Sequence, residues 1–203
     1  MEKMMKTAKM LDTICNIAQI LMIVAAVSAL IGALIVGAFF VFELRPEQVA
    51  SGYNALELGD YTLLLTQEAT PEPAKVLING AVEMGLGAVI AVLAWFCVRC
   101  VRQILTPMKA GLPFQKTAAE AMGKLALLTV IIGALDNGSR MLSLFLTAKC
   151  YDLPNLLVGG NVASAQLSYE LDLTFLLVGA VLLLLSYVFG YGAALQQQAD
   201  ETL

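Results

Sequence analysis

The sequence predicts an all-α membrane protein, with four transmembrane helices in an antiparallel bundle. Composition is the first reason: 59% of the 203 residues are apolar and 14% are charged, whereas a soluble domain has about 45–50% and about 25%. The mean hydropathy of +0.80 is the second. The third is that the apolar residues gather in four long stretches. These observations exclude a disordered chain and argue against a water-soluble domain.

The four stretches are each long enough to cross a membrane, because a helix needs about 20 mostly apolar residues to bridge roughly 30 Å of hydrocarbon. Only Glu83 in the second stretch, and Asp136 and Arg140 in the third, carry charge. We therefore expect a single integral membrane domain over residues 1–203. The predicted spans are residues 13–42, 76–98, 125–148 and 173–199.

The basic residues predict the orientation. Of the twelve Lys and Arg residues, eight precede the first span or lie between the second and third, three lie in the other two loops, and Arg140 lies within a span. The positive-inside rule then places both termini and loop 99–124 in the cytoplasm, and loops 43–75 and 149–172 outside. The eight are Lys3, Lys6, Lys9, Arg99, Arg102, Lys109, Lys116 and Lys124.

Turn and capping residues predict local structure in the connections. The first outer loop is long enough to form a small cap, in which the run 61–66 is either a strand or a helix lying at the interface. In the cytoplasmic connection, Thr106 and Pro107 are expected to end the second helix. Thr117 followed by Glu120 is a capping box that predicts the start of the third helix.

The charged residues inside the spans are candidates for a ligand or ion cluster. Glu83 lies about 10 Å from the outer end of its helix and Arg140 about 12 Å from the outer end of the next. Asp136 lies one turn deeper, on the face of Arg140, and Asn137 is an available hydrogen-bond partner. Charges at membrane depth usually face a partner or a wet cavity. Two interpretations stay open: a ligand pocket facing outward, and a structural ion-pair network.

Several catalytic chemistries are excluded. The chain has no histidine, so Ser-His-Asp catalysis, Cys-His catalysis and His-ligated metals are absent. Cys97 and Cys100 form a Cys-x-x-Cys motif at the expected cytoplasmic end of a span, where thiols stay reduced, so we interpret them as structural. We expect no enzymatic activity, no cofactor and no metal. The net charge of −4 comes mostly from the first outer loop, so it carries no inference about nucleic acid. We expect no direct nucleic-acid binding.

Two segments carry a resemblance to a known family: Gly111-Leu112-Pro113-Phe114, and the ending Gly190-Tyr191-Gly192-Ala193-Ala194-Leu195-Gln196-Gln197-Gln198-Ala199-Asp200-Glu201-Thr202-Leu203. With its span count and order, the chain resembles the uncharacterised bacterial four-helix membrane family catalogued as domain of unknown function 2975. The resemblance implies a multi-pass protein of the bacterial cytoplasmic membrane. It also implies a partner, because such proteins are often encoded next to a small helix-turn-helix regulator.

The leading functional prediction is a non-enzymatic regulatory or sensing protein whose cytoplasmic surface binds such a regulator. The alternative is a small transporter or channel-like protein that uses Glu83, Asp136 and Arg140. Small residues in the spans favour packing within the bundle and leave a homo-oligomer as an alternative. The candidate partner-binding residues are Pro113, Phe114, Gln196, Gln197, Asp200 and Glu201.

Overall fold

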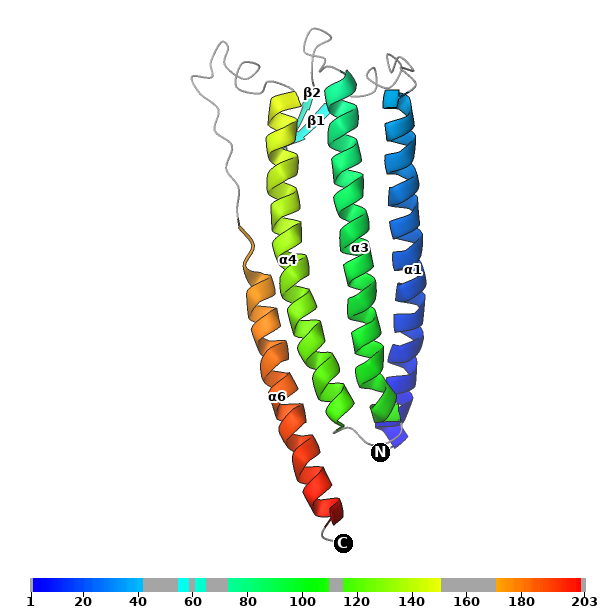
Figure 1. The fold of residues 1–203 in the computed structure, drawn as a ribbon, viewed down its shortest axis with the longest axis vertical. Coiled ribbons are helices and arrows are strands. Elements are labelled where there is room, and N and C mark those ends of the chain that lie inside the picture. The colour runs from blue at the N-terminus through cyan, green and yellow to red at the C-terminus, as the bar shows by residue number, and fades with distance from the viewer. Residues whose placement is uncertain are drawn as a thin grey trace. The chain divides into compact units, whose positions relative to one another are not determined.

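The computed structural model describes residues 2–41, 55–58, 61–64, 73–109, 115–150 and 171–201. These residues form four helices and one two-stranded hairpin (Figure 1). The helices are α1 (Glu2–Val41), α3 (Pro73–Lys109), α4 (Lys116–Cys150) and α6 (Thr174–Glu201).

All four helices are long and apolar enough to cross a membrane, which confirms the predicted number of spans. Each helix contains one predicted span to within one residue at its ends. The apolar side chains are largely uncovered by protein: Leu34 on α1 is 73% exposed and Leu177 on α6 is 68% exposed. Such exposure is costly in water but not against lipid tails. The exposed surfaces of the helices therefore fit a membrane environment, as their lengths do.

The chain divides into two compact units. The first comprises Met1–Val27, Ala88–Asn137 and Leu171–Leu203, and the second comprises Ser28–Gly87 and Gly138–Glu170. The first unit therefore takes the early part of α1, the later part of α3, the early part of α4 and all of α6. The second takes the other parts of α1, α3 and α4, together with the hairpin.

The core of the first unit is small and lies where α3, α4 and α6 meet. Ile104 of α3 packs with Ala121 and Met122 of α4, and the partly buried Met108, Leu125 and Phe189 surround them. The buried residues of α4 are mostly alanines, which allow neighbouring helices to approach closely. Packing in this unit therefore rests on close backbone approach more than on bulky side chains.

Two glycines show how closely α4 and α6 approach each other. A Cβ atom at Gly133 would lie 2.1 Å from Cγ of Phe175, and one at Gly179 would lie 2.6 Å from Cγ2 of Val130. A side chain at either position would force Phe175 or Val130 to shift, so glycine allows the close approach of the two helices. Ser186 strengthens the same contact, since its Oγ donates to the carbonyl oxygen of Ala119 at 2.7 Å.

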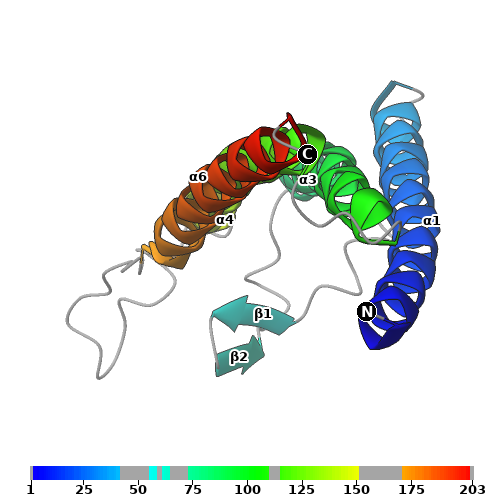
Figure 2. The same cartoon turned by 90° about the horizontal axis from the view of Figure 1, so that it is seen from below.

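The run 61–66 of the outer loop was expected to be either a strand or an interfacial helix, and the hairpin decides between them for the residues of that run that the structure describes. Strand β1 (Ala55–Leu58) pairs antiparallel with β2 (Tyr61–Leu64), in the register that joins Leu58 to Tyr61 (Figure 2). The strand alternative is therefore confirmed for Tyr61–Leu64. The hairpin belongs to the second unit.

The expected end of the second helix at Thr106 and Pro107 is wrong, because α3 continues to Lys109. Proline removes the N–H that would bond to the carbonyl oxygen of Gln103, and only two residues of α3 follow it. Thr106 Oγ1 also donates to the carbonyl oxygen of Arg102 at 2.8 Å. The third helix begins at Lys116, one residue before the predicted capping box.

Candidate functional site

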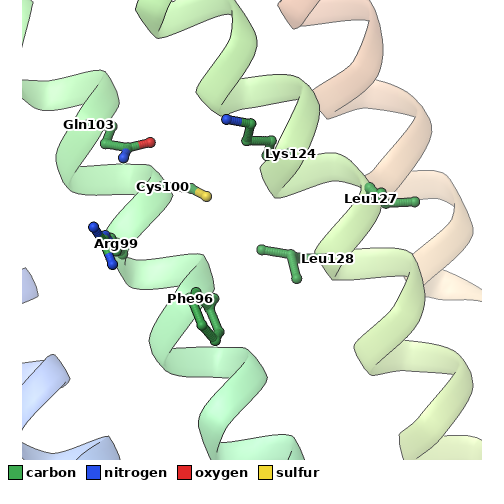
Figure 3. A pocket seen from close by; sticks show the side chains of 7 residues that line it. All are labelled: Phe96, Arg99, Cys100, Gln103, Lys124, Leu127 and Leu128. Carbon is green, nitrogen blue, oxygen red and sulfur yellow. The ribbon is translucent and has the colours of Figure 1, made fainter.

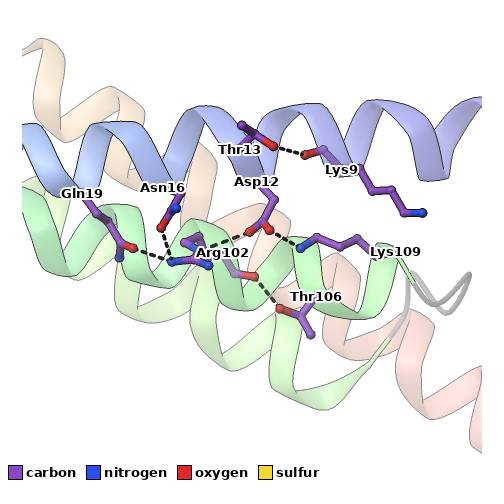
Figure 4. Close-up of polar contacts among 8 residues, drawn as sticks. All are labelled: Lys9, Asp12, Thr13, Asn16, Gln19, Arg102, Thr106 and Lys109. Carbon is purple, nitrogen blue, oxygen red and sulfur yellow. Dashed lines mark hydrogen bonds and ion pairs between the residues drawn. The ribbon is translucent and has the colours of Figure 1, made fainter.

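A polar cluster in the first unit joins α1 to α3 around the guanidinium of Arg102 (Figure 4). Arg102 Nε donates to Asp12 Oδ1 at 3.1 Å. Its Nη1 donates to Gln19 Oε1 at 2.6 Å and to Asn16 Oδ1 at 3.4 Å. Lys109, two turns further along α3, forms a second ion pair with Asp12. One carboxylate and two amides on α1 thus bind two cations on α3.

This cluster was not predicted from the sequence, although the spacing of its residues could have indicated it. Asp12, Asn16 and Gln19 are spaced four and three residues apart, so they form one polar stripe that runs into the first apolar stretch. Arg102 and Lys109 are seven residues apart and form a matching stripe on α3. With its guanidinium held by three acceptors, Arg102 is a positioning residue for the two helices.

Asn137, one of the predicted cluster residues, fixes the start of α6. Its Nδ2 donates to the carbonyl oxygens of Gly133 and Asp172, both at 2.9 Å, and its Oδ1 accepts from the backbone N–H of Asp172 at 3.1 Å. Asp172 Oδ1 in turn accepts from the backbone N–H of Thr174 at 2.9 Å and caps α6. Asn137 is only 9% exposed, so these bonds are shielded within the protein.

In the second unit, a ladder of polar contacts joins α3 to α4. Ser143 Oγ donates to Glu83 Oε1 at 2.5 Å, and Asn79 Nδ2 donates to Thr147 Oγ1 at 3.3 Å. Cys150 Sγ donates to the carbonyl oxygen of Lys75 at 3.4 Å. Along the ladder, the paired residues of α3 fall from 83 to 79 to 75, while those of α4 rise from 143 to 147 to 150.

A pocket of about 340 Å³ lies beside this ladder. Asn79 contributes the side-chain oxygen Oδ1, which is buried and has no hydrogen-bond partner in the described part of the chain. Lys149 lies over the ring of Phe145, 4.6 Å from its centroid. The residues that line the pocket are Lys75, Ile78, Asn79, Leu146, Lys149 and Cys150.

The first unit has its own pocket of about 330 Å³, between the later part of α3 and the early part of α4 (Figure 3). Arg99 and Lys124 supply two cations, one from each helix. Arg99 also lies 5.7 Å from the centroid of the Trp95 ring. The lining residues are Phe96, Arg99, Cys100, Gln103, Lys124, Leu127 and Leu128.

The other residues of the predicted ligand cluster fall into different units. Glu83 and Arg140 belong to the second unit, whereas Asp136 belongs to the first with Asn137. The structure brings Glu83 to Ser143, which lies one turn from Arg140 along α4. The acid-base-acid cluster itself stays a prediction.

The candidate partner-binding residues are described in part. Gln196, Gln197, Asp200 and Glu201 belong to the last turns of α6, where Gln197 Nε2 donates to Glu201 Oε1 at 3.0 Å. Gln197 and Glu201 are exposed. Pro113 and Phe114 lie outside the described residues.

The comparisons with known proteins add no relative. No protein-family model, no curated protein and no solved structure matches the chain. The resemblance found in the bend and the tail therefore stays a prediction.

Proposed function

We propose that the chain is a non-enzymatic regulatory protein of the bacterial cytoplasmic membrane, which holds a small cytoplasmic helix-turn-helix regulator at the membrane through the polar end of α6. In this proposal four antiparallel spans place both termini in the cytoplasm. The outer cap, or the pocket of the second unit, is the part that senses a signal.

One observation carries the proposal: α6 does not end where its apolar sequence ends. Leu195 is its last large apolar residue, yet the helix continues through Gln196 and Gln197 to Glu201. The exposed Gln197–Glu201 hydrogen bond supports this last turn. A polar, helical and exposed extension is a preformed surface for a partner, because it loses little conformational entropy on binding.

The proposed orientation has support in the first unit. The Asp12–Lys109 ion pair joins the early part of α1 to the end of α3, and Ser186 joins α6 to the early part of α4. The helix ends that flank the lysine-rich and arginine-rich segments therefore belong to one unit. The positive-inside rule assigns those segments to the cytoplasm.

The test uses the full chain and a small helix-turn-helix protein encoded next to it, which the resemblance leads us to expect. The two are co-expressed, and the regulator is measured in the membrane fraction. The proposal expects membrane retention that is lost when Gln196–Leu203 is deleted and reduced by the double substitution Gln197→Lys and Glu201→Lys. The matched control is Lys9→Gln, which changes an exposed charge of α1 that lines neither pocket and should leave retention unchanged. Retention that survives the deletion would overturn the proposal.

A second candidate function, a small transporter or channel-like protein, is favoured by the pocket of the second unit and by the buried, unpaired Oδ1 of Asn79. A buried acceptor without a donor is costly unless a ligand or water supplies one. Flux into liposomes that is abolished by Asp136→Asn or Glu83→Gln would support this candidate. Flux that is absent from the unsubstituted protein would exclude it.

A further inference from the structure

The pocket of the first unit combines the cations of Arg99 and Lys124 with an apolar wall. The proposed regulatory function makes no use of this pocket. Lys124 makes no hydrogen bond or ion pair with any residue that the structure describes. Arg99 makes a cation–π contact with the ring of Trp95 and no hydrogen bond or ion pair with any described residue. Among the described residues no carboxylate lines the pocket, and Glu120, one turn before Lys124, forms no ion pair with it. The site therefore carries a positive charge that lacks a partner within the described residues.

The polar and the large apolar residues that line the pocket lie on opposite sides of the ends of the predicted spans. The predicted second span ends at Val98 and the predicted third begins at Leu125, so Arg99, Gln103 and Lys124 lie just outside the apolar stretches. Phe96, Leu127 and Leu128 lie just inside them. Arg99 is three residues from Phe96, and Lys124 is three from Leu127, so on each helix the cation and the apolar residue share a face. Figure 3 shows these side chains on α3 and α4.

We propose that this pocket binds the phosphate of one anionic phospholipid between Arg99 and Lys124, with an acyl chain against Phe96, Leu127 and Leu128. Phosphate is the shared chemistry of a lipid head group and a free anion, and both cations and the amide of Gln103 can donate to it. The apolar wall favours the lipid, because a free phosphate gains nothing from it. Exposure of the wall agrees with a bound lipid, since Leu127 is 62% exposed and Phe96 is 42% exposed. Basic pockets between transmembrane helices are typical sites for such head groups.

Trp95 provides a reporter, because it is the only tryptophan of the chain and lies beside Arg99. The full-length protein is reconstituted in phosphatidylcholine vesicles, and a small fraction of brominated phosphatidylglycerol or brominated phosphatidylcholine is added to quench Trp95. The proposal expects brominated phosphatidylglycerol to quench at lower fractions than brominated phosphatidylcholine. Equal quenching by both lipids would overturn it.

The key variant is Lys124→Gln, which leaves Trp95 and its neighbour Arg99 in place. Loss of one cation should reduce the preference for phosphatidylglycerol about fivefold. Lys124→Arg should retain the preference and so separates loss of charge from misfolding. Lys116→Gln, an exposed lysine of the same helix that does not line the pocket, is the matched control. A loss with Lys116→Gln as large as with Lys124→Gln would overturn the proposal, because it would show general attraction to a charged surface.

A final measurement distinguishes the two sources of phosphate. Inorganic phosphate and glycerol 3-phosphate are added to the vesicles at constant ionic strength. If the site requires the acyl chain, neither should restore Trp95 fluorescence quenched by brominated phosphatidylglycerol. Displacement by either anion at millimolar concentration would assign the pocket to a free phosphate and overturn the lipid assignment. This outcome is independent of the regulator retained by α6, so each proposal can fail without the other.

Discussion

Arg102 of α3 and Asp12 of α1 form an ion pair with an Nε–Oδ1 distance of 3.1 Å, between residues 90 positions apart in the sequence. Arg102 is the more exposed partner, with 37% of its side chain accessible against 24% for Asp12. Asp12 also pairs with Lys109, so two cations of α3 share one carboxylate of α1. The pair therefore fixes how α1 lies on α3 within the first unit.

Arg102→Gln is expected to destabilise the protein by about 1 to 2 kcal/mol, because the variant loses a charge-assisted bond to Asp12 and shortens the reach to Gln19. Unfolding by sodium dodecyl sulfate in mixed micelles measures the change. Lys124→Gln removes the same charge without breaking a contact within the described residues and should cost little. An equal loss in both variants would contradict the proposed role of the ion pair.

The same pair predicts energetic coupling between the two helices. In a double-mutant cycle, Asp12→Asn should cost much less in the Arg102→Gln background than in the unsubstituted protein. The expected coupling energy is about 1 kcal/mol, within the range for residues in direct contact. Additive effects would show that the two side chains act separately.

Substitution of glycine by alanine should have different effects at the glycines of α4 and α6 that contact a neighbouring helix and at Gly85 of α3, which contacts none. Gly133→Ala and Gly179→Ala should each cost about 1 to 3 kcal/mol, since the new methyl group meets Phe175 or the stiff side chain of Val130. Gly85→Ala meets no atom within 4 Å and should be neutral or stabilising. Thermal unfolding in detergent measures all three. Recovery of Gly179→Ala by Val130→Ala would confirm the cause.

Much of the fold could be predicted from the sequence because a membrane imposes a length on apolar helices. The four spans follow from that length alone. The start of α1 could not be predicted so well: the helix begins at Glu2, through the polar residues that precede Thr13. Pairing with α3 near Asp12 stabilises those turns, and nothing in a hydropathy pattern reports such a contact.

The contacts of the candidate site were harder to predict, because depth along a helix does not give its rotation. Depth placed Glu83 level with Arg140, yet the structure gives Glu83 a hydrogen bond to Ser143, three residues away and about 4.5 Å along the axis. Arg102 lies just outside the predicted spans and was counted only as a flanking charge, whereas Asp12, just before the first span, was not considered. Asn16 and Gln19 are neutral, so a search for charges inside the spans passed over them.

Asn137 predicts how the start of α6 responds to substitution. Asn137→Ala removes three hydrogen bonds and leaves both backbone groups of Asp172 without this partner, so we expect a loss of about 2 to 3 kcal/mol. Asp172→Ala removes the cap on Thr174 and should cost about 1 kcal/mol. Hydrogen exchange at the first turn of α6 should rise in both variants. Loss of ligand-dependent activity with unchanged exchange would contradict this structural role.

For the hydrogen bond between Ser143 and Glu83, we expect removal of the donor to destabilise the protein more than removal of the charge. Ser143→Ala leaves a carboxylate at membrane depth without its donor and should cost about 1 to 2 kcal/mol. Glu83→Gln keeps an oxygen that accepts from Ser143 and eliminates a charge that lipid disfavours, so it should cost less or stabilise. Ser139→Ala, one turn earlier on α4, removes the same atom without losing the bond to Glu83 and is the matched control. Denaturation of the four proteins in one detergent compares them. A larger loss in Glu83→Gln than in Ser143→Ala would mean that the charge itself is required, because a carboxylate at that depth is favourable only when a cation, a proton or an ion-pair partner such as Arg140 compensates it.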